Sequence, residues 1–205
     1  MYNSSKTQRI AGTALLAAII IMLQTLSTFI LRPGLIPINL VLPAIVVGAA
    51  MYGPKAGAFL GACFGTVVLF SGITGTAPMS GMMWTANPIL MTIVTLGRGV
   101  AKGYVAGVVF AIFSKRKHQD GVLAAAIVTP IVNTGIFLAA LIFLFRSTLV
   151  HFAGDTNILY HAFIVMAGTN FIIELFINVG LVSVIVRILD SIKITQRGAT
   201  HGSGN

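Results

Sequence analysis

The sequence predicts an all-α integral membrane protein: a six-transmembrane-helix bundle with short loops and both termini in the cytoplasm. Of the 205 residues, 57% are hydrophobic and only 8% are charged, whereas a soluble domain carries roughly 25% charged residues. A water-soluble fold of this length could not bury so much apolar surface, so a bilayer must solvate it. Because one spanning helix needs about 20 apolar residues, the length allows six spans and no sizeable soluble domain.

Apolar stretches separated by proline, glycine and charged residues mark the expected spans. They cover approximately residues 10–30, 38–52, 56–70, 87–113, 122–145 and 159–189. We therefore expect residues 1–197 to form a single membrane domain and the glycine-rich residues 198–205 to be a disordered tail. The first stretch ends without a small-residue cleavage site, so it is interpreted as a helix rather than a removed signal peptide.

Turn residues bound the first three spans. The first ends near Pro33, in a sequence typical of a turn. Pro43 lies inside the second span, which we expect to be kinked or broken there, with a neighbour satisfying the freed carbonyl. Gly53 and Pro54 close that span. After the third span, the glycine- and serine-rich residues 71–83 are expected to form a loop.

The last three spans are longer. The fourth is expected to begin at Asn87 and Pro88 and to stop at the polar and basic residues 114–117. The fifth contains an internal proline, Pro130. The sixth stretch is longer than a bilayer requires, so it should tilt or project into the cytosol.

Lysine and arginine residues outside the spans give the expected orientation. With the N-terminus in the cytoplasm, the opposite side receives only Arg32 and Arg146. The cytoplasmic side receives nine: Lys6, Arg9, Lys55, Lys115, Arg116, Lys117, Arg187, Lys193 and Arg197. These residues explain most of the net charge of +9. No basic face interleaved with exposed aromatic residues occurs, so no nucleic-acid partner is expected.

No motif for covalent chemistry is found in the sequence. A serine nucleophile elbow, a phosphate-binding loop and a catalytic carboxylate pair are all missing, so neither an enzymatic activity nor a cofactor is expected. His151 and His161 have no third ligand nearby in sequence, which argues against a metal site. Cys63 stands alone in an apolar run and is interpreted as a packing residue.

Small residues recur at four-residue spacing in three predicted spans. Such faces let helix backbones approach closely in lipid. The third span carries Gly57, Gly61 and Gly65, and the fourth carries Gly99, Gly103 and Gly107. Both are interpreted as internal helix–helix contacts. The first span carries a pair of alanines, Ala14 and Ala18.

Three charged residues stand out inside the predicted spans, where charge is costly and points to function. Arg98 and Lys102 share a face of the fourth span, and Glu174 in the sixth is flanked at four-residue spacing by Asn170 and Asn178. One interpretation is a structural pair of Glu174 with Arg98 or Lys102. The other makes Arg98 the anchor of an anionic solute, since a guanidinium grips a carboxylate with two hydrogen bonds. The two interpretations are compatible.

Uncharged polar residues and one tryptophan complete the candidate site. Asparagine both donates and accepts, which suits a ligand rich in hydroxyl and amide groups, although each asparagine could instead bond a neighbouring helix. Trp84, after the expected loop, is a candidate lid or pocket wall. The predicted solute-binding residues are Trp84, Asn87, Arg98, Lys102, Asn133, Asn170 and Glu174.

The chain resembles the S components of the energy-coupling factor (ECF) transporters. The resemblance rests on the six short spans, the Ala14/Ala18 pair, the run at residues 42–57 and the stretch at residues 98–103. It implies a subunit of an ABC-type importer in the bacterial plasma membrane. Such a subunit binds one vitamin outside the cell in a pocket closed by the loops between spans one and two and between spans three and four. It further implies docking through Ala14 and Ala18 onto a transmembrane coupling subunit driven by two cytosolic ATPases, with ATP hydrolysis on those partners.

The vitamin is suggested by a finer resemblance. Residues 36–57 and 83–88 are most similar to pantothenate-specific S components. Pantothenate has one carboxylate, which Arg98 would suit, but folate also carries carboxylates, whereas hydroxymethylpyrimidine is neutral. Alternatives are therefore an S component for either of those compounds, or a small six-helix channel. A channel should show paired half-helix motifs in both halves of the chain, and no internal repeat is found.

Overall fold

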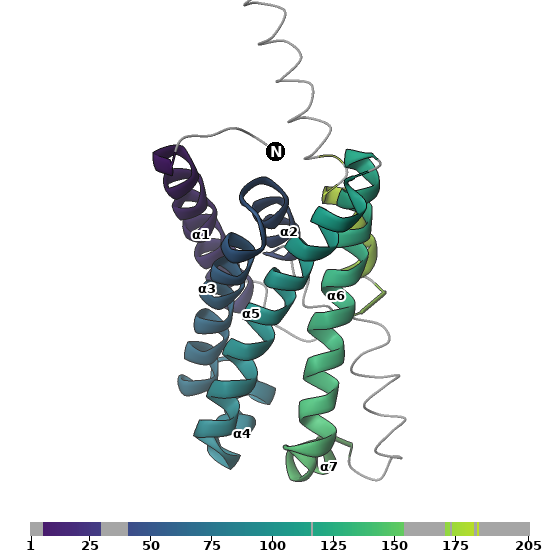
Figure 1. Ribbon diagram of the computed structural model, residues 1–205. Coiled ribbons are helices and arrows are strands. Elements are labelled where there is room, and N and C mark those ends of the chain that lie inside the picture. The colour runs from purple at the N-terminus through teal and green to yellow at the C-terminus, as the bar shows by residue number, and fades with distance from the viewer. Residues whose placement is uncertain are drawn as a thin grey trace, which may run out of the picture.

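A computed structural model describes residues 6–29, 41–115, 117–153, 171–172, 174–182 and 184. Within these residues every element of regular secondary structure is a helix, which confirms the predicted all-α class for this part of the chain (Figure 1). Among the described residues, four helices are long and apolar enough to cross a membrane. The count of six spans and the cytoplasmic position of the termini stay predictions.

The helix bounds follow the predicted spans closely. The helices are α1 (Lys6–Phe29), α2 (Val41–Tyr52), α3 (Pro54–Ile73), α4 (Pro78–Ala86), α5 (Pro88–Phe113), α6 (His118–Phe143) and α7 (Arg146–Ala153). The four spanning candidates are α1, α3, α5 and α6, and α2 is a shorter apolar helix. Of the predicted sixth span, residues 171–172, 174–182 and 184 are helical, and its remaining residues lie outside the described part.

The helices α1, α2, α3, α5 and α6 run side by side, and successive ones alternate in direction, which gives the bundle two distinct ends (Figure 1). One end holds the start of α1, the α2–α3 junction and the α5–α6 connection. We call it the basic end, because it carries Lys6, Arg9, Lys55, Lys115 and Lys117. The other, the α4/α7 end, holds the two short helices and Arg146. This distribution of basic residues is the one on which the predicted orientation rests.

A tight corner joins α2 to α3 at the basic end. Gly53 has φ +93°, a left-handed conformation that glycine adopts without steric cost. Pro54 follows in the first turn of α3, where a missing N–H is harmless. Arg9 on α1 donates from Nη2 to the Tyr52 carbonyl over 2.7 Å, which satisfies one of the carbonyls left free at the end of α2.

Two sequence-based expectations concern local structure. The described part of the second span is not broken at Pro43, because α2 is helical from Val41 to Tyr52. Residues 71–83 are not a loop. Helix α3 continues to Ile73, and α4 begins at Pro78 after a turn in which Gly75 has φ +66°.

The glycines of that supposed loop instead allow two helices to pack closely. A Cβ added at Gly72 would lie 3.0 Å from the Ser80 carbonyl oxygen of α4. A composition typical of a loop therefore reflects close contact between α3 and α4.

The glycine faces of α3 and α5 are internal helix contacts, as predicted, and they meet each other. A Cβ added at Gly61 would collide with the Gly99 carbonyl, and one added at Gly57 would collide with the Gly103 carbonyl; the reverse substitutions would collide in the same way. Gly107 packs against the start of α3 at Pro54. Because no side chain separates the two backbones, α3 and α5 are the most closely packed helix pair of the described bundle.

Apolar clusters fill both ends of the interior. The α4/α7-end cluster joins α4, α5, α6 and α7 and contains Met83, Met91, Val94, Leu138, Ala140, Leu141, Phe145 and Leu149. The basic-end cluster contains Val46, Ala49, Ala106, Val122, Ala125, Ala126 and Val182. Along α5 and α6, the charged and amide side chains lie between these two clusters.

Candidate functional site

Lys102 is at the centre of a polar cluster in the middle of the bundle. Its side chain is 0% exposed. The Nζ atom donates to Asn133 Oδ1 of α6 over 3.2 Å and lies 3.2 Å from the ring centroid of Phe64 on α3. An ammonium over an aromatic face is attracted by the ring quadrupole. One buried ammonium therefore links three helices.

Arg98 lies one turn from Lys102, towards the α4/α7 end of α5. Its Cζ atom lies 4.9 Å from the ring centroid of Phe137 on α6. Its Nε atom is buried and has no hydrogen-bond partner in the described part of the chain. A buried guanidinium N–H without an acceptor is costly, so Arg98 retains donor capacity that a ligand could use.

Glu174 contributes the negative charge of this cluster. It is 3% exposed and interacts electrostatically with both Arg98 and Lys102. The structure thus brings together Arg98, Lys102, Asn133 and Glu174, all predicted as site residues. Counted by formal charge, these residues have two basic groups and one acidic group, a surplus of one positive charge.

Asn178 has a structural role that the sequence interpretation missed. It is 0% exposed, and its Nδ2 donates to the Ala126 carbonyl of α6 over 2.6 Å. Ala126 lies four residues before Pro130, so proline removes the N–H that would bond this carbonyl within the helix. Asn178 supplies the missing donor. The sequence signals for this role were Pro130 inside the fifth predicted span and the amide of Asn178 in the sixth.

Three other predicted site residues lie elsewhere. Asn87 is the N-cap of α5, and its Oδ1 accepts a hydrogen bond from the Leu90 amide over 3.0 Å. Trp84 belongs to α4 and packs against the α4/α7-end cluster. Asn87 precedes Arg98 by about three helical turns, so neither residue joins the polar cluster. Asn170 lies outside the described residues.

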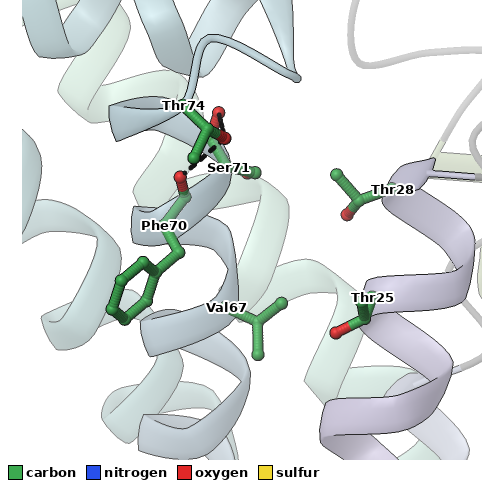
Figure 2. A pocket seen from close by; sticks show the side chains of 6 residues that line it. All are labelled: Thr25, Thr28, Val67, Phe70, Ser71 and Thr74. Carbon is green, nitrogen blue, oxygen red and sulfur yellow. Dashed lines mark hydrogen bonds between the residues drawn. The ribbon is translucent and has the colours of Figure 1, made fainter.

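A separate cleft of about 260 Å³ opens between the ends of α1 and α3 that lie towards the α4/α7 end (Figure 2). Its hydroxyl groups are already used, because each donates to a carbonyl of its own helix. None of the described residues that line it is charged. The lining residues are Thr25, Thr28, Val67, Phe70, Ser71 and Thr74.

The sequence matches one known protein family. A model of the substrate-specific component of ECF transporters matches residues 8–186. The chain belongs to this family. No curated protein matches the chain. The family assignment makes it a substrate-binding transport subunit, and its apolar helices make it a multi-pass membrane protein.

The alanine pair of this S component faces outward. Ala14 and Ala18 are both exposed on α1, whereas the neighbouring Ala17 is 7% exposed and packs against the core. The two alanines therefore form a small-residue surface that another membrane helix can approach closely.

Proposed function

We propose that this S component captures a vitamin bearing a carboxylate, with pantothenate as the first candidate, and delivers it through a coupling subunit driven by two ATPases. The observation that carries the proposal is the buried cluster of Arg98, Lys102 and Glu174, which holds one surplus positive charge. Family membership favours this role over the channel alternative.

Arg98 is the better anchor for the carboxylate. Lys102 already binds Asn133 and the Phe64 ring, whereas the Arg98 Nε has no partner among the described residues. A guanidinium also offers a planar fork that matches a carboxylate, which an ammonium cannot do. An incoming carboxylate would neutralise the surplus charge and fill the unused donors.

Asn133 would read a second group of the same ligand. Lysine can only donate, so the Asn133 amide must turn its oxygen towards Lys102. Its Nδ2 group is then the side available to a ligand, where it would donate to a hydroxyl or to an amide carbonyl. Pantothenate carries both groups beside its carboxylate. Hydroxymethylpyrimidine is neutral and would leave the surplus charge uncompensated, and folate is the remaining carboxylate-bearing candidate.

The test is equilibrium binding of the purified protein in detergent to pantothenate, folate, hydroxymethylpyrimidine and pantothenol. Pantothenol is the matched probe, since it replaces the carboxylate of pantothenate with an alcohol. We expect submicromolar binding of pantothenate and much weaker binding of pantothenol. Equal affinities would refute the carboxylate anchor, and preference for another vitamin would replace pantothenate.

We also propose that the basic end lies in the cytoplasm of a bacterial cell, as the positive-inside rule requires. Membrane-impermeant thiol labelling of intact cells tests this sidedness, in a background that lacks Cys63. Ser147→Cys on α7 should be labelled from outside, and Lys117→Cys should react only after the cells are broken. The opposite result would invert the topology.

A further inference from the structure

The inner part of the polar cluster is closed to solutes. Lys102 is 0% exposed and Asn133 is 6% exposed, whereas Arg98 is half-buried, so a solute can pass from Arg98 to Asn133 only if a wall of the cluster moves. The wall formed by α3 and α5 is poorly suited to this, because backbone meets backbone at Gly61 and Gly99. The wall that moves is therefore formed by another helix.

Helix α6 contains a proline deep in its interior, at Pro130. On one side of it, Val122, Ala125 and Ala126 are fixed in the basic-end cluster. On the other side, Asn133 and Phe137 contact Lys102 and Arg98. Pro130 therefore separates the part of α6 in the basic-end cluster from the part that covers the charged residues, which packs into the α4/α7-end cluster through Leu138, Ala140 and Leu141.

Two backbone carbonyl groups near Pro130 accept hydrogen bonds from side chains. The Ala126 carbonyl bonds Asn178 Nδ2 over 2.6 Å, and the Ala125 carbonyl accepts from the Thr129 hydroxyl over 2.7 Å. Side chains thus satisfy both carbonyls independently of the helical ladder. A change of bend at Pro130 would therefore leave neither carbonyl without a partner.

We propose that Pro130 is a hinge about which residues 131–143 of α6 swing away from α5 and open the cluster to the solute. Gly135 on this part is exposed, and a Cβ added there would meet nothing within 4 Å. The α4/α7-end cluster must loosen for this motion. It contains Met91 of α5 and Met83 of α4 beside Val94, Leu138 and Leu141, and the unbranched methionine side chains repack easily. The idea that this motion admits the solute rests on the proposed function, whereas the motion itself does not depend on it.

The experiment measures distances between spin-label pairs by double electron–electron resonance, without ligand, in the full chain carrying Cys63→Ala. One pair, at Ile89 and Phe143, spans the α4/α7 ends of α5 and α6. The other, at Phe113 and Leu123, spans their basic ends. All four positions are exposed. We expect a broad or bimodal distribution for the first pair and a single narrow distribution for the second.

Pro130→Ala is the decisive variant, because it restores the backbone N–H and should fold at least as well as the parent. It should collapse the Ile89–Phe143 distribution to one narrow peak and leave the other pair unchanged. The control is Pro88→Ala, at the first position of α5, which should change neither. The hinge would be overturned if the two pairs gave distance distributions of equal width in the parent. It would also be overturned if Pro130→Ala did not narrow a broad Ile89–Phe143 distribution. Since no ligand is added, failure of the vitamin assignment leaves this result intact.

Discussion

Lys102 and Asn133 join α5 to α6 through a buried hydrogen bond of 3.2 Å between Nζ and Oδ1. An ammonium at this depth in a membrane protein needs an acceptor, because the bilayer offers no water to replace it. Within the described residues, Asn133 provides that acceptor, and the face of Phe64 provides a second attraction. The bond therefore matters for stability and for the shape of the proposed site.

Removal of this acceptor should destabilise the protein. Asn133→Leu leaves the Lys102 ammonium without its hydrogen bond, which should cost about 1–3 kcal/mol or more. Asn133→Asp keeps an acceptor and adds an opposite charge, so it should retain most of the stability. The measurement is the thermal unfolding midpoint in detergent. Equal midpoints for the two variants would show that the bond contributes little.

Replacement of Arg98 should weaken binding of a carboxylate-bearing vitamin. Arg98→Ala should lower pantothenate affinity by well over tenfold, since a charge-assisted bidentate contact in a dry site is worth roughly 2–5 kcal/mol. Arg98→Lys keeps the positive charge but loses the planar guanidinium group, so its pantothenate affinity should fall between those of the parent and of Arg98→Ala. Isothermal titration gives these affinities, with pantothenol as the control ligand. If Arg98→Ala leaves pantothenate affinity unchanged, the anchoring role is wrong.

The contact between α3 and α5 should not tolerate a side chain. Gly99→Ala places a Cβ against the Gly61 carbonyl and should destabilise the protein by about 1–3 kcal/mol through overpacking. Gly97→Ala on the same helix is the matched control, because its Cβ meets nothing within 4 Å. It should be neutral or stabilising by up to about 1 kcal/mol, as alanine favours a helix over glycine. Equal unfolding midpoints would refute the close contact.

Enlargement of the exposed alanines should separate binding from transport. Ala14→Leu combined with Ala18→Leu changes two exposed positions of α1, so vitamin affinity should stay within about twofold of the parent. Uptake by cells that contain the coupling subunit and ATPases should be lost, because two bulky side chains prevent close helix docking.

Ile93→Trp, on the exposed face of α5, controls for bulk and should leave uptake unchanged. Loss of binding in the alanine double variant would instead mean that this face supports the fold.

Patterns carried along single helices were predictable from the sequence. The glycine repeats of α3 and α5 form internal helix contacts as expected, because four-residue spacing keeps small residues on one face whatever the tertiary context. That the two faces meet each other was not predicted. The clustering of Arg98, Lys102 and Glu174 followed from the cost of isolated charge in lipid. The capping role of Asn87 had a local signal as well, an asparagine directly before a proline and an apolar run.

Features that depend on a partner far away in sequence were not predictable. Gly72 and neighbouring residues looked like part of a loop, because the approach of α4 to α3 that uses this glycine is a tertiary contact. Asn178 was known only by its spacing from Glu174. Its bond to the Ala126 carbonyl, 52 residues away, depends on which helices are neighbours and in what register.

The link between Asn178 and Pro130 can be measured by a double-mutant cycle. In the parent, Asn178→Leu deprives the Ala126 carbonyl of its donor and should cost about 1–3 kcal/mol. In a Pro130→Ala background, the new backbone N–H can bond the same carbonyl, so Asn178→Leu should cost less. The coupling energy between the two positions should be on the order of 1 kcal/mol, obtained from unfolding free energies of the four proteins. The Asn178 Oδ1 atom has no partner among the described residues, so the lost interaction belongs to Nδ2. An identical cost in both backgrounds would show that Asn178 stabilises the protein by packing alone.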